Sequence, residues 1–266
     1  MSKGQHDPQG IIRRQNERKR KRMRIMKIRR TIFFSVIGLI FVYIILFHTP
    51  IFRIRNVEIQ GNTQIDSAEI LNCIGETENK NIFRAKTSAM KKAILKLPYV
   101  RSVDIDRVVL KSKLTVTVEE CEEAACLSGG AGFIIIDREA KVLAESVEKP
   151  AGIPEVIGLS VTNIALGEKL KIGESDAERF DILLMCLKEM SKHEILNGVT
   201  NISVADIGNI TFNYENRLDA ICGSNVDLQK KIGFFKSALS SPQLTENSRG
   251  TINLTNSGEG KAIYTP

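Results

Sequence analysis

Five cysteines are the side chains of this 266-residue chain that are most able to do chemistry, because a thiol can act as a nucleophile, ligate a metal or form a disulfide. Their spacing contains neither a CxxC redox motif nor half of a zinc site. The odd count leaves at least one thiol unpaired, and a local disulfide between the second and third cysteines is an open alternative. The other three are expected to be small buried hydrophobic side chains. The five are Cys73, Cys121, Cys126, Cys186 and Cys222.

A catalytic thiol or hydroxyl needs a base beside it, and this chain offers few candidates. Only three histidines occur: His6 and His48 lie in the amino-terminal part, and His193 lies at the end of an expected helix. The motifs GxSxG and HExxH and a Gly-rich phosphate loop are absent. We therefore expect no catalysis, no cofactor and no metal site.

The basic residues are concentrated at the amino end. Residues 1–30 hold 12 of the 38 Lys and Arg residues and 2 of the 31 Asp and Glu residues, a net charge of +10, whereas the rest of the chain carries a net −3. A dense basic run can neutralise nucleic-acid phosphates, but this one ends directly at an apolar segment. Residues 31–47 include 14 Ile, Leu, Val, Phe or Tyr residues, and the next charge is at Arg53. An uncharged helix of about 17–22 residues spans roughly 25–33 Å, enough to cross a membrane.

Lys and Arg beside a membrane segment favour the cytoplasmic side. We therefore predict a cytoplasmic tail over residues 1–30, a transmembrane helix over 31–47 and an extracytoplasmic remainder. A cleaved signal peptide is the competing interpretation, but residues 46–52 lack the small-x-small pair that cleavage requires. Because the outer part is slightly acidic, no nucleic-acid partner is expected.

A β-α-α-β-β order is predicted directly after the anchor. Residues 53–62 alternate apolar and polar side chains and end at Gly61-Asn62, a turn pair in which Gly61 is expected to have a positive φ. Helical periodicity follows over 65–74, where Asp66 can cap the first turn, and over 87–97. Two further runs alternate with period two and predict an antiparallel pair. These runs are residues 100–108 and 113–120.

A second unit of mixed helices and strands is predicted in the remaining chain. It should contain a hairpin, a helix, three strands, a second helix and two closing strands. The expected ranges are 132–143, 174–190, 199–206, 209–216, 218–222, 226–239, 251–255 and 261–265.

Several phrases of the sequence carry a family resemblance. FRIRNVEIQGN, IFR, LPYVRSVDIDR and LTVTVEE resemble the POTRA domain of the bacterial cell-division proteins FtsQ and DivIB. A basic tail and one anchor ahead of that domain match the family's layout. One departure is VLKSKL, where the family usually has a proline between the last two strands. In the second unit the 132–143 hairpin is similar to the family's turn of Asp, two residues and Gly, with Ala140 in place of the glycine.

The resemblance implies an α+β fold in four parts. These are the tail (1–30), the transmembrane helix (31–47), a POTRA domain (52–120) and an FtsQ/DivIB-type β-domain (121–266) that ends in an edge strand. It also implies a non-enzymatic scaffold of the division septum in the cell membrane. Such a scaffold binds FtsB/DivIC-like and FtsL-like single-pass proteins and helps control septal peptidoglycan synthesis.

The physical mechanism of partner binding would be strand addition to an exposed sheet edge. The closing strand suits this because its middle has neither charge nor proline, and Pro266 comes only at its end. By the resemblance, Tyr264 falls where an aromatic contact residue is expected, although an ordinary edge aromatic is an equal alternative. The predicted partner-binding residues are Lys261, Ala262, Ile263, Tyr264 and Thr265.

Two other classes of protein share parts of this layout. A membrane-anchored sortase-like cysteine transpeptidase would have the same topology, but it needs a Thr-Leu-x-Thr-Cys strand. Cys186 follows ILLM and Cys222 follows LDAI instead. Another POTRA-bearing transport or chaperone protein usually carries several POTRA units or a membrane β-barrel, and neither is apparent in this sequence.

Overall fold

The computed structural model describes residues 8–130, 132–242, 244–255 and 262–266. The chain divides into two compact units, and the boundary between them passes through three strands of one sheet. The first unit comprises residues up to 58 together with 76–86 and 106–115; the second comprises 59–75, 87–105 and 116–266.

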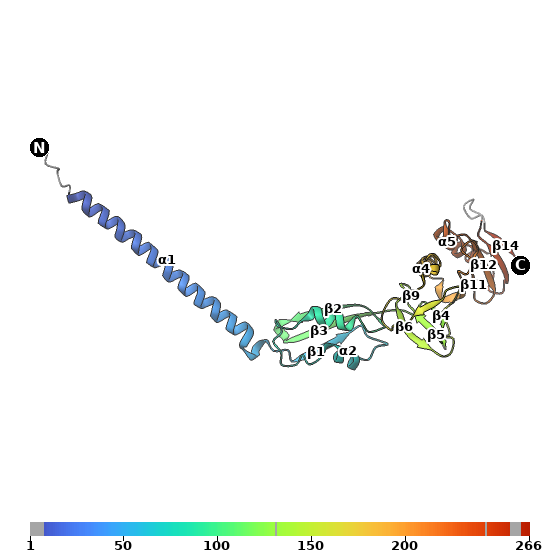
Figure 1. Cartoon of the computed structure of the whole chain (residues 1–266), viewed down its shortest axis with the longest axis horizontal. Coiled ribbons are helices and arrows are strands. Elements are labelled where there is room, and N and C mark those ends of the chain that lie inside the picture. The colour runs from blue at the N-terminus through green and yellow to red at the C-terminus, as the bar shows by residue number, and fades with distance from the viewer. Residues whose placement is uncertain (1–7, 131, 243, 256–261) are drawn as a thin grey trace. The chain divides into compact units, whose positions relative to one another are not determined.

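Helix α1 (Pro8–His48) contains the predicted transmembrane segment (Figure 1). By length and composition, the stretch Met23–His48 is long and apolar enough to cross a membrane. None of it is buried within the protein, and its large apolar side chains from Ile32 to Ile44 are exposed. Exposure of so many apolar side chains is unfavourable in water and favourable in lipid.

The β-α-α-β-β order expected after the anchor is confirmed. Its three strands form one sheet in the order β1-β3-β2. The expected first strand over 53–62 is shorter in the structure, because Ile54 is fully buried and its backbone bonds to the loop at Asn79 and Lys80 rather than to a strand. The elements are β1 (Asn56–Gln60), α2 (Ser67–Ile74), α3 (Thr87–Ile94), β2 (Val100–Val108) and β3 (Lys113–Glu120).

Two local signals of this region act as the sequence predicts. The Asp66 side chain caps α2 by accepting a hydrogen bond from the amide of Ala68 at 3.1 Å. Gly61 ends β1 with φ at +83°. A β-carbon at Gly61 would also lie 2.2 Å from the carbonyl oxygen of Val118 in β3, a contact that the sequence did not predict.

Glu120, at the end of β3, holds the loop that follows β1. Its carboxylate accepts hydrogen bonds from the amides of Thr63, Gln64 and Ile65 at 2.9–3.1 Å, and from the Thr63 hydroxyl. Burial alone would raise the pKa of Glu120, but these hydrogen bonds outweigh it and lower the pKa to about 2. The loop between β1 and α2 is therefore fastened by an ionised carboxylate.

Acid should release this loop selectively. A carboxyl group whose pKa is depressed in the folded state stabilises the fold above its unfolded pKa of about 4.3, and this stabilisation is lost as the pH falls toward 2. Hydrogen exchange at the amides of 63–65 should accelerate relative to the rest of the sheet between about pH 4 and 2. Glu120→Gln should show weak protection at all pH values, and Glu119→Gln, a change at the exposed neighbouring carboxylate, should behave like the wild type. Equal protection in Glu120→Gln and wild type at neutral pH would contradict the assignment.

A nine-stranded sheet forms most of the second unit. Its order is β14-β13-β12-β11-β10-β7-β4-β5-β6. A separate two-stranded sheet pairs β8 (Val161–Asn163) with β9 (Lys171–Ile172). The strands of the large sheet are β4 (Ala125–Gly129), β5 (Gly132–Ile136), β6 (Val142–Ser146), β7 (Glu155–Ile157), β10 (Val199–Ser203), β11 (Ile210–Tyr214), β12 (Leu218–Gly223), β13 (Gly250–Asn253) and β14 (Ile263–Thr265).

Helices make two of the crossover connections of this sheet (Figure 1), and the connection between the parallel strands β4 and β7 contains the β5–β6 hairpin instead. Helix α4 (Ala177–Lys192) lies between the parallel strands β7 and β10, and α5 (Leu228–Leu239) lies between the parallel strands β12 and β13. Parallel neighbours require a crossover connection, and where it is helical it places the helix against a face of the sheet. The β12-α5-β13 crossover thus determines where the closing strands lie.

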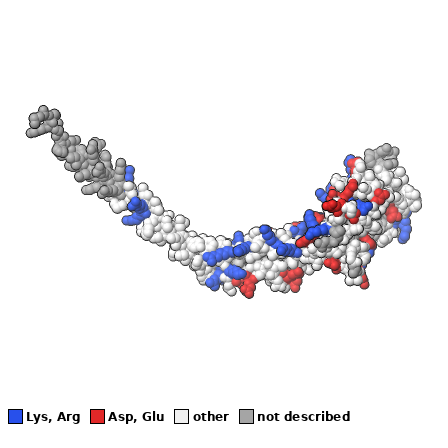
Figure 2. Space-filling view, viewed as in Figure 1, with Lys and Arg blue, Asp and Glu red and all other residues white. Residues whose placement is uncertain are grey.

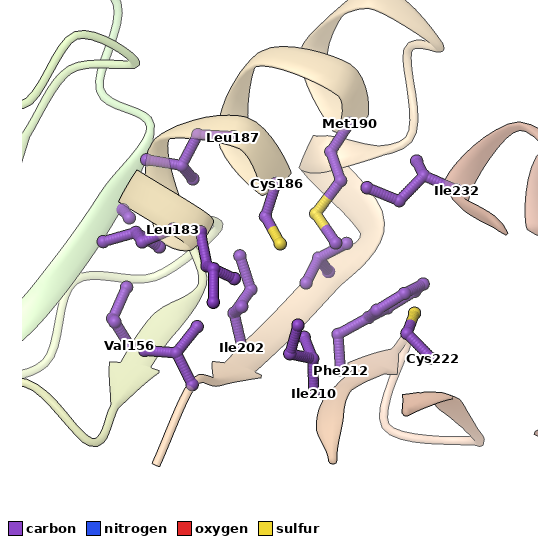
Figure 3. Packing of buried hydrophobic residues seen from close by; sticks show 14 of the residues in the cluster. Val156, Leu183, Cys186, Leu187, Met190, Ile202, Ile210, Phe212, Cys222 and Ile232 are labelled. Atoms are coloured by element: carbon purple, nitrogen blue, oxygen red, sulfur yellow. The ribbon is translucent and has the colours of Figure 1, made fainter. Parts of the chain in front are cut away.

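The core lies between these helices and the sheet. Figure 3 shows Leu183, Cys186 and Met190 of α4 directed toward Ile202 and Phe212 of the strands. All five cysteines are free thiols, so the alternative of a Cys121–Cys126 disulfide is not realised. Cys186 and Cys222 are fully buried, as expected from the sequence, whereas Cys73 is only partly buried.

The β5–β6 hairpin turns as the sequence resemblance implied. Ala140 occupies the position of the expected glycine and has φ at +62°, in the left-handed region. The Asp137 carboxylate accepts hydrogen bonds from the amides of Glu139 at 2.9 Å and Lys141 at 2.8 Å, which hold the turn closed.

The predicted boundary near residue 120 lies inside the second compact unit. The Nζ of Lys141 donates hydrogen bonds to the carbonyl oxygens of Leu95, Leu97 and Val100 at 3.2, 2.9 and 2.6 Å. A β-carbon at Gly167 would lie 2.2 Å from the carbonyl oxygen of Lys96. The hairpin and the 167–169 loop therefore contact the segment that follows α3.

Candidate functional site

Strand β14 is an outermost strand of the nine-stranded sheet. It pairs antiparallel with β13, which places Tyr264 opposite Ile252 and Ile263 opposite Asn253. In the described part of the chain, no other strand lies on its outer side. The outward N–H and C=O groups of β14 thus offer a template for another chain.

The opposite edge of the sheet is partly covered. At the start of β6, the amide of Val142 donates to the carbonyl of Glu168, and the carbonyl of Val142 accepts from the amide of Gly167, both at 2.9 Å. Among the described residues, β14 has no comparable backbone cover. It is therefore the more accessible of the two edges.

The predicted site residues occupy different positions at this edge. Lys261 lies outside the described residues, and Ala262 is exposed and precedes the strand. Ile263, Tyr264 and Thr265 form β14, with Ile263 55% exposed. None of these three residues carries a charge or a proline ring that would block pairing.

Tyr264 has a structural role that the sequence did not indicate. Its ring packs against the core of the second unit on the same side as its buried partner Ile252. Its hydroxyl donates a hydrogen bond to the carbonyl of Arg249 at 2.8 Å. A change of this side chain would therefore perturb packing within the closing strands as well as any contact with a partner.

A groove of about 270 Å³ lies beside β14, and its lining combines apolar side chains with the hydroxyls of Ser237 and Ser241. Helix α5 forms one wall, with Phe234 and Ala238, and the closing strands form the other, with Ile252 and Tyr264. A strand added to β14 directs alternate side chains to the two faces of the sheet, so one set would be presented on the side of the groove. The arrangement suits main-chain pairing combined with burial of one or two apolar side chains.

The buried cysteines of the second unit show little capacity for covalent chemistry. Burial raises the pKa of Cys222 to about 12 and raises that of Cys186 further still, which disfavours the thiolate needed for nucleophilic attack. No group of three or more His, Cys, Asp or Glu side chains within the described ranges could hold a metal ion.

Comparison with known proteins decides the family. A family model for the POTRA domain, FtsQ-type, matches residues 52–120. The cell division protein FtsQ of Corynebacterium glutamicum is 30% identical over 158 residues, which cover 53% of this chain and 70% of that relative. The chain belongs to the FtsQ/DivIB family of cell-division proteins. The sequence resemblance and the α+β fold class are thereby confirmed.

Two DivIB proteins extend the similarity over most of this FtsQ/DivIB chain. The cell division protein DivIB of Clostridium tetani is 23% identical over 227 residues, which cover 85% of this chain and 84% of the relative. DivIB of Clostridium acetobutylicum is 23% identical over 217 residues, which cover 81% of this chain and 83% of that relative. The matched POTRA segment ends well before β14, so the partner-binding role of residues 261–265 remains a prediction.

The sequence of this FtsQ/DivIB protein did not predict the groove beside β14. Its walls come from α5 and from strands that begin more than ten residues later, and no local pattern links them. The sequence signal for this groove was the apolar pair Phe234 and Ala238, which lie on one face of the helix next to fully buried residues. A pair of this kind looks the same as an ordinary core-facing helix face.

Proposed function

We propose that this FtsQ/DivIB protein is a non-enzymatic scaffold of the division septum that binds small single-pass division proteins at β14. The partners would be of the FtsB/DivIC and FtsL types, and their binding would help place and control septal peptidoglycan synthesis. The observation that carries the proposal is an uncharged, open edge strand beside a groove that apolar side chains partly line. A division role itself follows from the family.

Strand addition provides specificity as well as affinity. Main-chain hydrogen bonds to β14 would align a partner segment, and an apolar side chain in the groove would select its register. The proposed domain organisation is a POTRA domain over 52–120, which contributes to recruitment, and a β-domain over 121–266 that holds this site. The buried thiols and the family's division role favour a scaffold over the sortase-like and transport alternatives.

Affinity purification of the intact protein from membranes tests this function. An FtsB/DivIC-like and an FtsL-like protein should co-purify from cells solubilised in mild detergent. A variant without residues 262–266 should retain the anchor and lose these partners. Recovery of neither partner with the intact protein would overturn the proposed function.

The proposed topology gives a separate prediction. From the net charge of +10 before the apolar segment, residues 1–30 should lie inside the cell and residues 48–266 outside, with the anchor retained. Protease added to intact protoplasts should digest the outer part and spare a tag on the amino terminus, which should be digested only after permeabilisation. A mature protein that starts near residue 50 would show that the segment is a signal peptide instead.

A further inference from the structure

The membrane helix passes into the first compact unit through a very short connection. Only Thr49 separates His48 from the 3₁₀ turn Pro50–Phe52, so Ile51 lies within about 10 Å of the helix end by chain length alone. The side chain of Asn81 donates a hydrogen bond to the carbonyl of Leu46 at 2.7 Å. The unit therefore begins at the surface of any bilayer that α1 crosses.

Aromatic rings continue from the helix into this unit. The ring centroid of Phe83 lies 6.0 Å from that of Phe47 in α1 and 5.4 Å from that of Phe52. The guanidinium of Arg84 lies over the Phe47 ring at 5.8 Å. These contacts hold the loop around residue 83 against the exit of the helix.

The turn between β2 and β3 carries an exposed apolar side chain close to the end of α1. Leu110, in the 3₁₀ turn Val109–Lys111, is 100% exposed, and Ile51 is 60% exposed. The Ser112 hydroxyl donates to the carbonyl of Ile51 at 3.2 Å, and the amide of Arg55 donates to the carbonyl of Ser112 at 2.8 Å. The turn that carries Leu110 is thus fastened directly beside the residues that follow the membrane helix.

Exposed cations lie on the chain segments next to these apolar side chains. Lys111 adjoins Leu110, Arg53 and Arg55 follow Ile51 within four residues, and Lys80 lies in the loop whose carbonyl accepts a hydrogen bond from the amide of Ile54. Figure 2 shows Lys and Arg side chains on this part of the unit. Apolar tips flanked by cations bind membrane interfaces, because the tips enter the region between headgroups and acyl chains while the cations meet lipid phosphates.

We propose that the turn Val109–Lys111 is a second membrane contact of this protein. Leu110 and Ile51 would enter the interface of the outer leaflet, and Lys111 would meet an anionic headgroup. A lipid surface is the favoured occupant, because the connection to α1 leaves no room to move this turn far from the bilayer. The inference rests on the proposed membrane anchoring of α1 and extends it, since a second contact would limit rotation of the unit about the connection.

Fluorescence quenching by brominated lipids tests the contact in the full chain. The protein has no tryptophan, so Leu110→Trp introduces a single probe at a fully exposed position. The variant is reconstituted in vesicles of phosphatidylcholine and phosphatidylglycerol with plain or brominated acyl chains. We expect the probe's emission to shift to shorter wavelength and to fall about twofold with brominated lipid.

Two further single-tryptophan variants make the result decisive. Phe41→Trp lies within α1 and should be quenched by brominated lipid whenever the anchor is inserted. Val147→Trp, at an 84% exposed apolar position in the second unit, should be unaffected. An unquenched probe at 110 with a quenched probe at 41 would overturn the second contact and leave anchoring intact. Absence of quenching at both positions would overturn the anchoring itself.

Discussion

A proline that removes the outward-facing amide donor of β14 is expected to reduce co-purification of an FtsB/DivIC-like partner by about tenfold or more, because loss of one main-chain hydrogen bond and of strand geometry costs at least about 1.4 kcal/mol. Adjacent amides of a strand point to opposite sides. Proline at Ile263 and proline at Tyr264 therefore remove donors from opposite sides of β14. The change that removes the outward donor should weaken partner binding, whereas the other should disturb pairing with β13. Proline at Tyr264 also removes the ring that packs on the core, so it should lower the melting temperature in either case.

A charge at the same edge provides a matched comparison. Ile263→Lys places a charge on the outermost strand, where charges oppose strand addition. Ile207→Lys makes the same change in the turn after β10, at a side chain that is 40% exposed. Only the change at 263 should reduce the amount of co-purified partner. Normal binding by Ile263→Pro, Ile263→Lys and a chain without residues 262–266 would place the interface elsewhere.

Tyr264 is a less informative position than the sequence suggested. A side chain that only lined the edge and was partly solvated would tolerate lysine with little change in stability. Because the ring packs on the core and the hydroxyl bonds to Arg249, Tyr264→Lys should lower the melting temperature as well as weaken binding. Tyr264→Phe removes only the hydrogen bond to Arg249 and should leave partner binding close to wild type.

Valine at Gly61 should destabilise the region that contains β1 and β3 by about 3 kcal/mol or more, combining the strain of a positive φ with a steric clash. Gly61 has φ at +83°, and its β-carbon would lie 2.2 Å from the carbonyl oxygen of Val118. Backbone strain at the turn alone predicts a destabilisation of about 1–3 kcal/mol. The close approach of β3 adds to this, because the backbone of Val118 cannot move without disturbing the sheet.

Gly75 provides the control for this substitution. It has φ at +70° at the end of α2, and no atom lies within 4 Å of its β-carbon position. Gly75→Val therefore incurs the conformational strain without the clash. The measurement is the urea concentration at which the amides of β1 and β3 lose hydrogen-exchange protection. An equal decrease of this urea concentration in both variants would show that the structure accommodates the contact with Val118 without losing stability.

Local sequence patterns determined the elements of this protein and the order in which they occur. Periodicity within ten to twenty residues was sufficient for α2, α3 and most of the strands, but it did not predict β4, β7, β8 or β9. Gly61 and Ala140 marked two turns whose backbones have positive φ. The apolar stretch after the basic tail also indicated the anchor, because a membrane helix is recognised by the length and charge of one segment, without any contact to other parts of the chain.

Tertiary structure alone decided which surfaces these elements expose. The late start of β1 follows from the burial of Ile54 against a loop some 25 residues later in the chain, and the role of Tyr264 follows from α5 lying beside the closing strands. Leu110 belongs to the turn in VLKSKL, which the sequence marked only as a departure from the family's usual proline, and only its attachment to Ile51 places it beside the membrane helix. Each of these features depends on contacts between residues far apart in sequence. Such contacts form only when the chain folds, so no pattern within a single segment encodes them.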